Sequence, residues 1–146
     1  MTGLLVLARP HVSLLDGPRL AWWLAHRRGI RNALFPVDPA YARHPLCAPL
    51  LRGYGWLVGG HRMVPLDTDS PFALRHLAQI LMAGKTIVLF PQGTGLKEGP
   101  DRPDRPGAQW LIERARPQVL TVTISQDRFI LASRSLHHAQ SLESRL

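Results

Sequence analysis

Short runs of apolar residues recur along the chain, and each has the length of a buried strand. Polar, glycine-rich or proline-containing segments separate the runs, so each is expected to be a separate element. We predict clear strands over 4–8, 86–90 and 118–124, and weaker ones over 32–37 (broken by Pro36), 62–66 and 128–132.

Between these runs, apolar residues recur with the spacing of amphipathic helices. The clearest helix is predicted over 72–83, with Ser70 as its N-cap and Gly84 at its end. Its buried stripe is expected to consist of Leu74, Leu77, Leu81 and either Phe72 or Ile80. We also predict helices over 18–28 and 107–116, and one or two short helices over 41–54 that Pro45 and Pro49 interrupt.

Strands that alternate with helices are typical of an α/β protein. We therefore expect a single-layer sheet, largely parallel or mixed, flanked by helices. A chain of 146 residues is the size of one domain. We assign 1–146 to a single domain and expect 132–146, which is rich in Ser and His, to be a frayed tail.

Charge narrows the possible partners. There are 18 Lys and Arg residues against 10 Asp and Glu, for a net charge of +8, and 16 of the 18 are arginine. Such an excess suits nucleic acid, an anionic membrane surface or acidic substrates. No nucleic-acid motif or aromatic-rich basic stripe is present, so we expect no nucleic-acid partner. With Cys47 as the only cysteine, an internal disulfide and a cysteine-rich metal site are excluded, and we predict no metal.

The most informative polar pattern is His11-Val-Ser-Leu-Leu-Asp16. It places a histidine after the first strand and a carboxylate at the start of the next helix. If the chain bends between them, the carboxylate can orient the imidazole and stabilise the imidazolium that forms on proton transfer. The alternative is that Asp16 is a helix N-cap and His11 a loop residue.

A second candidate segment, Pro91-Gln-Gly-Thr-Gly95, directly follows the 86–90 strand. Ligands of α/β sheets bind at the carboxyl ends of strands. Glycines there allow exposed backbone N–H groups to hold an oxyanion or a phosphate, although the segment is equally compatible with a simple turn. It matches neither the P-loop nor the G-x-G-x-x-G fingerprint of nucleotide-binding proteins.

Taken in order, these segments resemble the glycerolipid acyltransferase family. That family has an H-x-x-x-x-D block, a strand ending in F-P-E-G-T-R, and a later V-P-V-x-I strand. The resemblance covers residues 4 to about 125. Within it, the run of Val64–Asp67, Pro71–Leu77 and Phe90-Pro91 most resembles the branch that reacylates 2-acylglycerophosphoethanolamine. The corresponding segments are His11–Asp16, Val64-Pro-Leu-Asp67, Pro71-Phe-Ala-Leu-Arg-His-Leu77, Phe90-Pro-Gln-Gly-Thr-Gly95 and Val119-Leu-Thr-Val-Thr-Ile124.

The resemblance implies an acyltransferase. His11 would be the general base that deprotonates the free hydroxyl of a lysophospholipid, and Asp16 would orient it. The acyl thioester of CoA or of acyl carrier protein would be the donor, as a co-substrate, with no other cofactor. Gln92, Gly93, Thr94, Gly95 and Arg62 would bind substrate.

This chain also departs from the family pattern. The family's glutamate is Gln92 here, and two phosphate-binding arginines are replaced by Thr68 and Gly95. Arg62 or Lys97 is a candidate substitute, and we expect a zwitterionic lysophospholipid to be preferred over lysophosphatidic acid. Two alternatives stay open: a non-catalytic relative that acts as a basic membrane-surface module, and an acyl-thioester hydrolase.

No apolar run reaches the roughly 18–20 residues of a membrane span. We expect the protein to lie peripherally on the inner, cytoplasmic face of the cell membrane. Trp22, Trp23, Trp56 and neighbouring leucines would supply apolar contact there. A competing expectation is that at least two of the four tryptophans are core residues.

Overall fold

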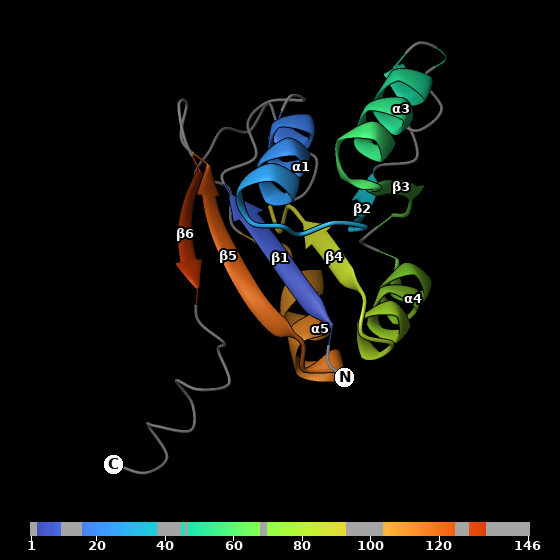
Figure 1. The fold of residues 1–146 in the computed structure, drawn as a ribbon. Coiled ribbons are helices and arrows are strands. Elements are labelled where there is room, and N and C mark those ends of the chain that lie inside the picture. Colours follow the sequence, from blue (N-terminus) through green and yellow to red (C-terminus); the bar gives the residue numbers. More distant parts are fainter. Residues whose placement is uncertain are drawn as a thin grey trace.

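The computed structural model describes residues 3–9, 16–37, 45, 47–67, 70–92, 104–124 and 129–133 (Figure 1). Strands and helices alternate along most of the chain, as the apolar pattern predicts. The elements are β1 (Leu4–Arg9), α1 (Asp16–Arg27), β2 (Leu34–Val37), α3 (Cys47–Gly59), β3 (Arg62–Pro65), α4 (Pro71–Met82), β4 (Thr86–Leu89), α5 (Pro106–Ala115), β5 (Gln118–Ile124) and β6 (Phe129–Ser133).

The strands form one sheet in the order β3-β2-β4-β1-β5-β6. The first five are parallel, and β6 is antiparallel to β5 at the sheet edge. This confirms the predicted α/β class with a largely parallel sheet. The first strand of the chain is thus central, with β4 and β5 as its neighbours.

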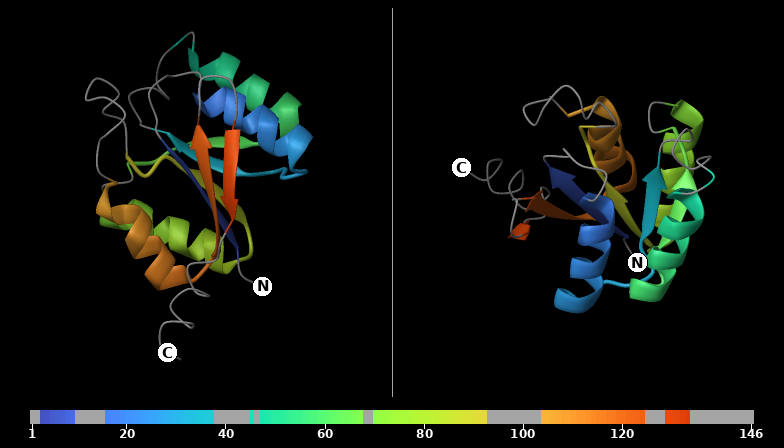
Figure 2. Two further views of the ribbon diagram at one scale, coloured as in Figure 1. Left: turned by 90° about the vertical axis from the view of Figure 1, so that its left-hand side faces the viewer. Right: turned by 90° about the horizontal axis from the view of Figure 1, so that it is seen from above.

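Helices cover both faces of the sheet (Figure 2). Along β1, Leu5 and Leu7 pack with α4 and α5 on one face, whereas Val6 and Ala8 pack with α1 on the other. This alternation is the two-residue period of a strand that is buried on both sides. Helix α3 packs on α1 and on β3.

The predictions for α4 are largely confirmed, and the one difference is at its N-cap. Ser70 occupies the N-cap position of α4, but its side chain makes no capping hydrogen bond. Phe72 is exposed, and Leu77 and Leu81 are buried with Ala73 and Ala78, while Leu74 and Ile80 are partly buried. The left-handed backbone of Gly84 does follow the end of α4, as predicted.

Prolines interrupt fewer elements than predicted. Pro36 lies inside β2, in register with Val64 of β3, because β2 pairs with β4 only at Leu34. Pro49 is the third residue of α3, in the first turn, where N–H groups have no intrahelical partner. As a result α3 is a single helix that continues to Gly59.

The tryptophans also differ from the core expectation. Trp22, Trp56 and Trp110 are exposed, and Trp23 is only partly buried against the core. Burial is supplied by aliphatic residues instead, mainly the leucines, valines and alanines of the strands and of α1, α4 and α5.

Candidate active site

Two of the predicted site segments begin at neighbouring strands. β1 and β4 are adjacent and parallel, with Leu7 in register with Leu89. The segment with His11 follows β1, and the segment that starts at Pro91 follows β4. Both segments therefore begin at the carboxyl ends of the parallel strands, where ligands of α/β proteins bind. We call this end of the sheet its carboxyl edge.

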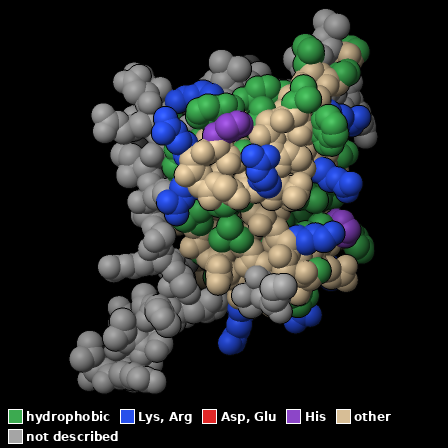
Figure 3. All heavy atoms as spheres, in the orientation of Figure 1, with side chains coloured by type: hydrophobic (Ala, Val, Ile, Leu, Met, Phe, Trp, Pro, Cys, Tyr) green, Lys and Arg blue, Asp and Glu red, His purple; other side chains and the backbone are tan. Residues whose placement is uncertain are grey.

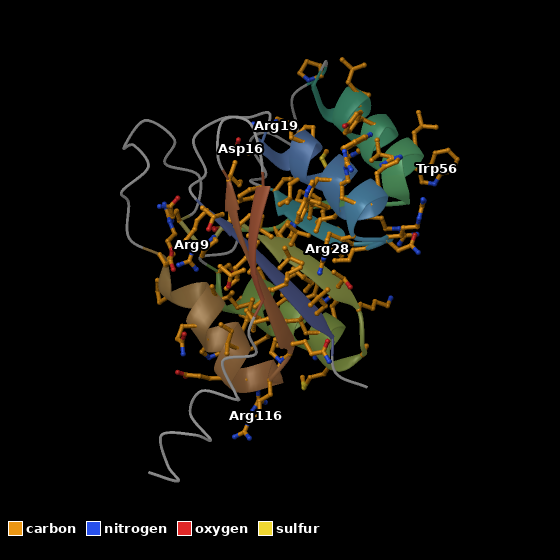
Figure 4. All side chains as sticks on the ribbon, turned by 60° about the vertical axis from the view of Figure 1, so that its left-hand side comes forward. Arg9, Asp16, Arg19, Arg28, Trp56 and Arg116 are labelled. Atoms are coloured by element: carbon orange, nitrogen blue, oxygen red, sulfur yellow. The ribbon has the colours of Figure 1, made fainter. Side chains whose placement is uncertain are left out.

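Asp16 is the first residue of α1 and is almost fully buried, with 1% of its surface exposed. Leu20 and Leu24, which are fully buried, pack this helix onto the sheet and so fix where it begins. The carboxylate lies at the positive end of the helix dipole and has interaction partners within the protein. Both a helix cap and a histidine orienter require such a fixed carboxylate. Figure 4 shows it at the upper end of α1.

Gln92 follows β4 and is also buried, with 6% exposed and with an interaction partner. Just before it, the Pro91 carbonyl accepts a hydrogen bond of 2.7 Å from the backbone N–H of Arg105. This bond ties the end of β4 to the start of α5. Because Gln92 is uncharged, its burial avoids the desolvation cost that a carboxylate would have there.

The structure adds Arg9, which our sequence reasoning did not assign to the site. It ends β1, and its Nη1 lies 2.9 Å from Oδ2 of Asp104, just before α5. Its Nε is buried and has no hydrogen-bond partner. The signal in the sequence was the strand alternation, which places Arg9 on the same face as Leu5 and Leu7, toward α5 (Figure 4).

Arg62 is not brought to this edge. It is the first residue of β3, the outermost strand on one side of the sheet. Arg62 pairs with Leu34 of β2, Leu34 pairs with Ile87 of β4, and Ile87 pairs with Leu5 near the start of β1. The exposed Arg62 is therefore at the amino end of its strand, and two strands separate β3 from β1. The remaining predicted site residues (His11, Gly93, Thr94 and Gly95) and the Lys97 and Thr68 positions lie outside the described residues.

Comparison with known proteins agrees with this α/β architecture. A family model described as Acyltransferase matches residues 2–125. The chain belongs to this family, the glycerolipid acyltransferases, as the order of its motifs indicated. Membership implies an acyl donor and an acceptor as substrates. No solved structure matches the chain.

None of the helices in the described part of the chain has the length and apolar character needed to cross a bilayer.

Proposed function

We propose that this protein transfers a fatty acyl group from an acyl thioester to the free hydroxyl of a lysophospholipid. The observation that carries the proposal is the juxtaposition at the carboxyl edge of the sheet. The segment with His11 follows β1, Gln92 follows the neighbouring β4, and the buried Asp16 begins α1. Family membership supplies the acyl-transfer chemistry.

In the proposed mechanism, His11 removes the proton of the acceptor hydroxyl while Asp16 stabilises the resulting imidazolium. The acceptor oxygen attacks the thioester carbonyl, and donors such as the backbone N–H groups of Gly93 and Thr94 stabilise the developing oxyanion. The carbon–sulfur bond then breaks, and the imidazolium returns its proton to the departing thiolate. The products are a diacyl phospholipid and the free thiol of CoA or acyl carrier protein.

We assign Arg9, in place of Arg62, to the headgroup side of this site. Its guanidinium is at the carboxyl edge, and Asp104 offsets its charge at 2.9 Å. Gln92 adds no charge. An edge of low net charge suits a zwitterionic headgroup better than a phosphate monoester, which prefers uncompensated arginines. Because the acceptor is a lipid, we place the reaction at a membrane surface, on the cytoplasmic side where acyl donors are made.

One assay tests the proposal. Purified protein is given a labelled acyl thioester with lysophosphatidylethanolamine or lysophosphatidic acid, and labelled lipid and free thiol are measured together. We expect equal release of both products and a preference for the zwitterionic acceptor. His11→Ala should lower the rate about 10²–10⁴-fold, and Asp16→Asn should also impair turnover, with the thermal unfolding midpoint as the control for folding.

The outcomes separate the alternatives. Thiol release without lipid product would identify a thioester hydrolase, and no release with any acceptor would identify a non-catalytic relative. If Asp16→Asn lowers only the unfolding midpoint, Asp16 is a helix cap. Asp104→Asn leaves Arg9 without its counter-charge, so it should shift the preference toward lysophosphatidic acid; an unchanged preference would remove Arg9 from the headgroup site.

A further inference from the structure

Four large side chains of helix α3, three of them from leucine or tryptophan, are exposed. Leu50, Trp56 and Leu57 are 74%, 69% and 77% exposed, and Tyr54 is 38% exposed. A surface helix of a globular protein normally shows the opposite polarity, with apolar residues toward the core. At about 100° per residue, Leu50, Tyr54 and Leu57 share one side of the helix and Trp56 lies next to that side. Exposed apolar residues gathered in this way mark an interaction surface. We call these four residues the α3 apolar face.

The inward side of α3 explains this reversal. It carries Gly55 and Gly59, which are buried against neighbouring elements. A Cβ atom on Gly59 would lie only 2.7 Å from Nε2 of His61 and 2.8 Å from Cβ of Ala25 in α1. At this contact the helix packs through its backbone, whereas Leu50, Trp56 and Leu57 stay outside the core. Trp56 accordingly points away from the body of the molecule (Figure 4).

The surroundings of the α3 apolar face are positively charged. The described segments 16–37 and 47–67 contain two acidic residues, the buried Asp16 and the exposed Asp67. The same segments contain six arginines, and Figure 3 shows Lys or Arg side chains beside the hydrophobic ones over α3. All but Arg19 are exposed: Arg27, Arg28, Arg31, Arg52 and Arg62.

We propose that the α3 apolar face docks on the surface of an anionic lipid bilayer. Tyrosine and tryptophan prefer the level of the lipid headgroups, leucines insert below it, and arginines attract anionic lipids. A second copy of this chain fits less well, because a symmetric dimer would bring the same five exposed arginines of each copy face to face.

The proposed docking also orients the candidate active site. β2 and β3 are parallel and α3 connects them, so α3 must run antiparallel to the strands. Its first turns, including Leu50, are therefore on the side of the sheet where the strands have their carboxyl ends (Figure 1). A lipid acceptor would reach the candidate site from the docked bilayer. This inference rests on the proposed function for the lipid nature of the acceptor.

The test is sedimentation of the full chain with lipid vesicles. One set of vesicles contains phosphatidylcholine alone, and the other contains phosphatidylcholine mixed with phosphatidylglycerol. We expect wild-type protein to bind the anionic vesicles more strongly. Leu57→Glu should weaken this binding about tenfold, since it removes apolar insertion and adds a like charge. Leu50→Glu is the second variant of the same face.

The matched control is Phe72→Glu on α4, because Phe72 is 79% exposed but belongs to the helix layer on the other face of the sheet. It should bind as wild type does, and unchanged unfolding midpoints should show that all three variants fold. Equal binding by Leu57→Glu and Phe72→Glu, or no preference for anionic vesicles, would overturn the inference, as would a concentration-dependent dimer that Leu57→Glu abolishes.

Failure of the proposed docking and failure of the proposed function give different results in these experiments. His11→Ala should retain vesicle binding while it loses transfer. Transfer without vesicle binding by the wild type would contradict the docking alone. Binding to vesicles without transfer to any acceptor would contradict the proposed function alone.

Discussion

His61 is the one histidine in the described part of the chain that is buried, and both of its ring nitrogens are used. Nδ1 accepts a hydrogen bond from the Ala33 N–H at 3.1 Å, which leaves Nε2 to donate to the Ala21 carbonyl, also at 3.1 Å. The ring packs edge-on against Phe35. This neutral histidine therefore ties α1 to the segment that leads into β2. Its pKa is lowered from 6.5, first by burial and further by the charge of Arg31, against the opposing effect of the bond to Ala21.

The lowered pKa makes the stability of the protein depend on pH. Below about pH 6.5 the unfolded chain binds a proton at this position more readily than the folded chain, so folding becomes less favourable as the pH falls. Protonation also turns Nδ1 into a donor that faces the Ala33 N–H. We expect the free energy of unfolding to fall by at most about 1.4 kcal/mol per pH unit from this group. Urea denaturation at a series of pH values measures it.

His61→Gln is the control for this prediction. Glutamine does not titrate, so the variant should be less stable than wild type at neutral pH but should show a weaker loss on acidification. The other histidines are common to both proteins. An identical pH dependence in the two would mean that His61 does not titrate with folding.

At this scale, the sequence predicted where a motif residue lies along the chain, but not which contacts distant residues make. Asp16 was predicted at a helix start, and it is the first residue of α1. The ion pair of Arg9 was not predicted, because its partner Asp104 is distant in sequence. Arg62 was predicted near the site, but it is the first residue of its strand and so lies at the amino ends of the parallel strands, away from the candidate site.

At the scale of elements, the apolar pattern predicted most strands and helices because burial imposes its period on the sequence. β5 has the predicted bounds, and α5 begins and ends one residue before its predicted bounds. The exception is α3, which was predicted as one or two short helices because of its prolines but is a single helix. Its large apolar residues are exposed, so their spacing did not indicate a face packed on the core.

The close contact between α3 and α1 can be tested with glycine substitutions. Gly59→Ala would bring a methyl group against His61 and Ala25, so we expect it to destabilise the fold by about 1–3 kcal/mol. Gly53→Ala is the matched control on the same helix. Apart from its chain neighbours and its own helix backbone, no atom of the described residues lies within 4 Å of its Cβ position. Alanine there should stabilise the helix by about 0.5–1 kcal/mol. Thermal or urea denaturation gives both values, and equal effects at the two positions would contradict the tight packing of α3.

At the scale of the whole molecule, the order of the strands was beyond the sequence pattern. The apolar pattern predicts where strands occur along the sequence but not which strands pair. That β1 lies between β4 and β5 depends on contacts between segments that are distant in sequence. The same arrangement brings the segments with His11 and Gln92 to neighbouring strands. The motif order identified the family before the fold explained why these motifs belong together.

The net charge of +8 leads to a last prediction about the molecule as a whole. If the protein docks on anionic lipid through both arginines and the α3 apolar face, the two contributions respond differently to salt. Each basic residue near the surface contributes about 1 kcal/mol of attraction. At about 1 M salt the screening length falls to about 3 Å, so this attraction is largely lost. Apolar insertion is not screened.

We therefore expect high salt to release part of the vesicle-bound protein, and to release more of Leu57→Glu than of wild type or Phe72→Glu. Sedimentation across a salt series measures this. Complete release of the wild type would show that charge alone holds the protein to lipid, since nothing inserted in the bilayer would resist screening. If high salt releases none of the wild type, apolar insertion alone holds the protein to lipid, because the arginines around α3 would then contribute nothing to binding.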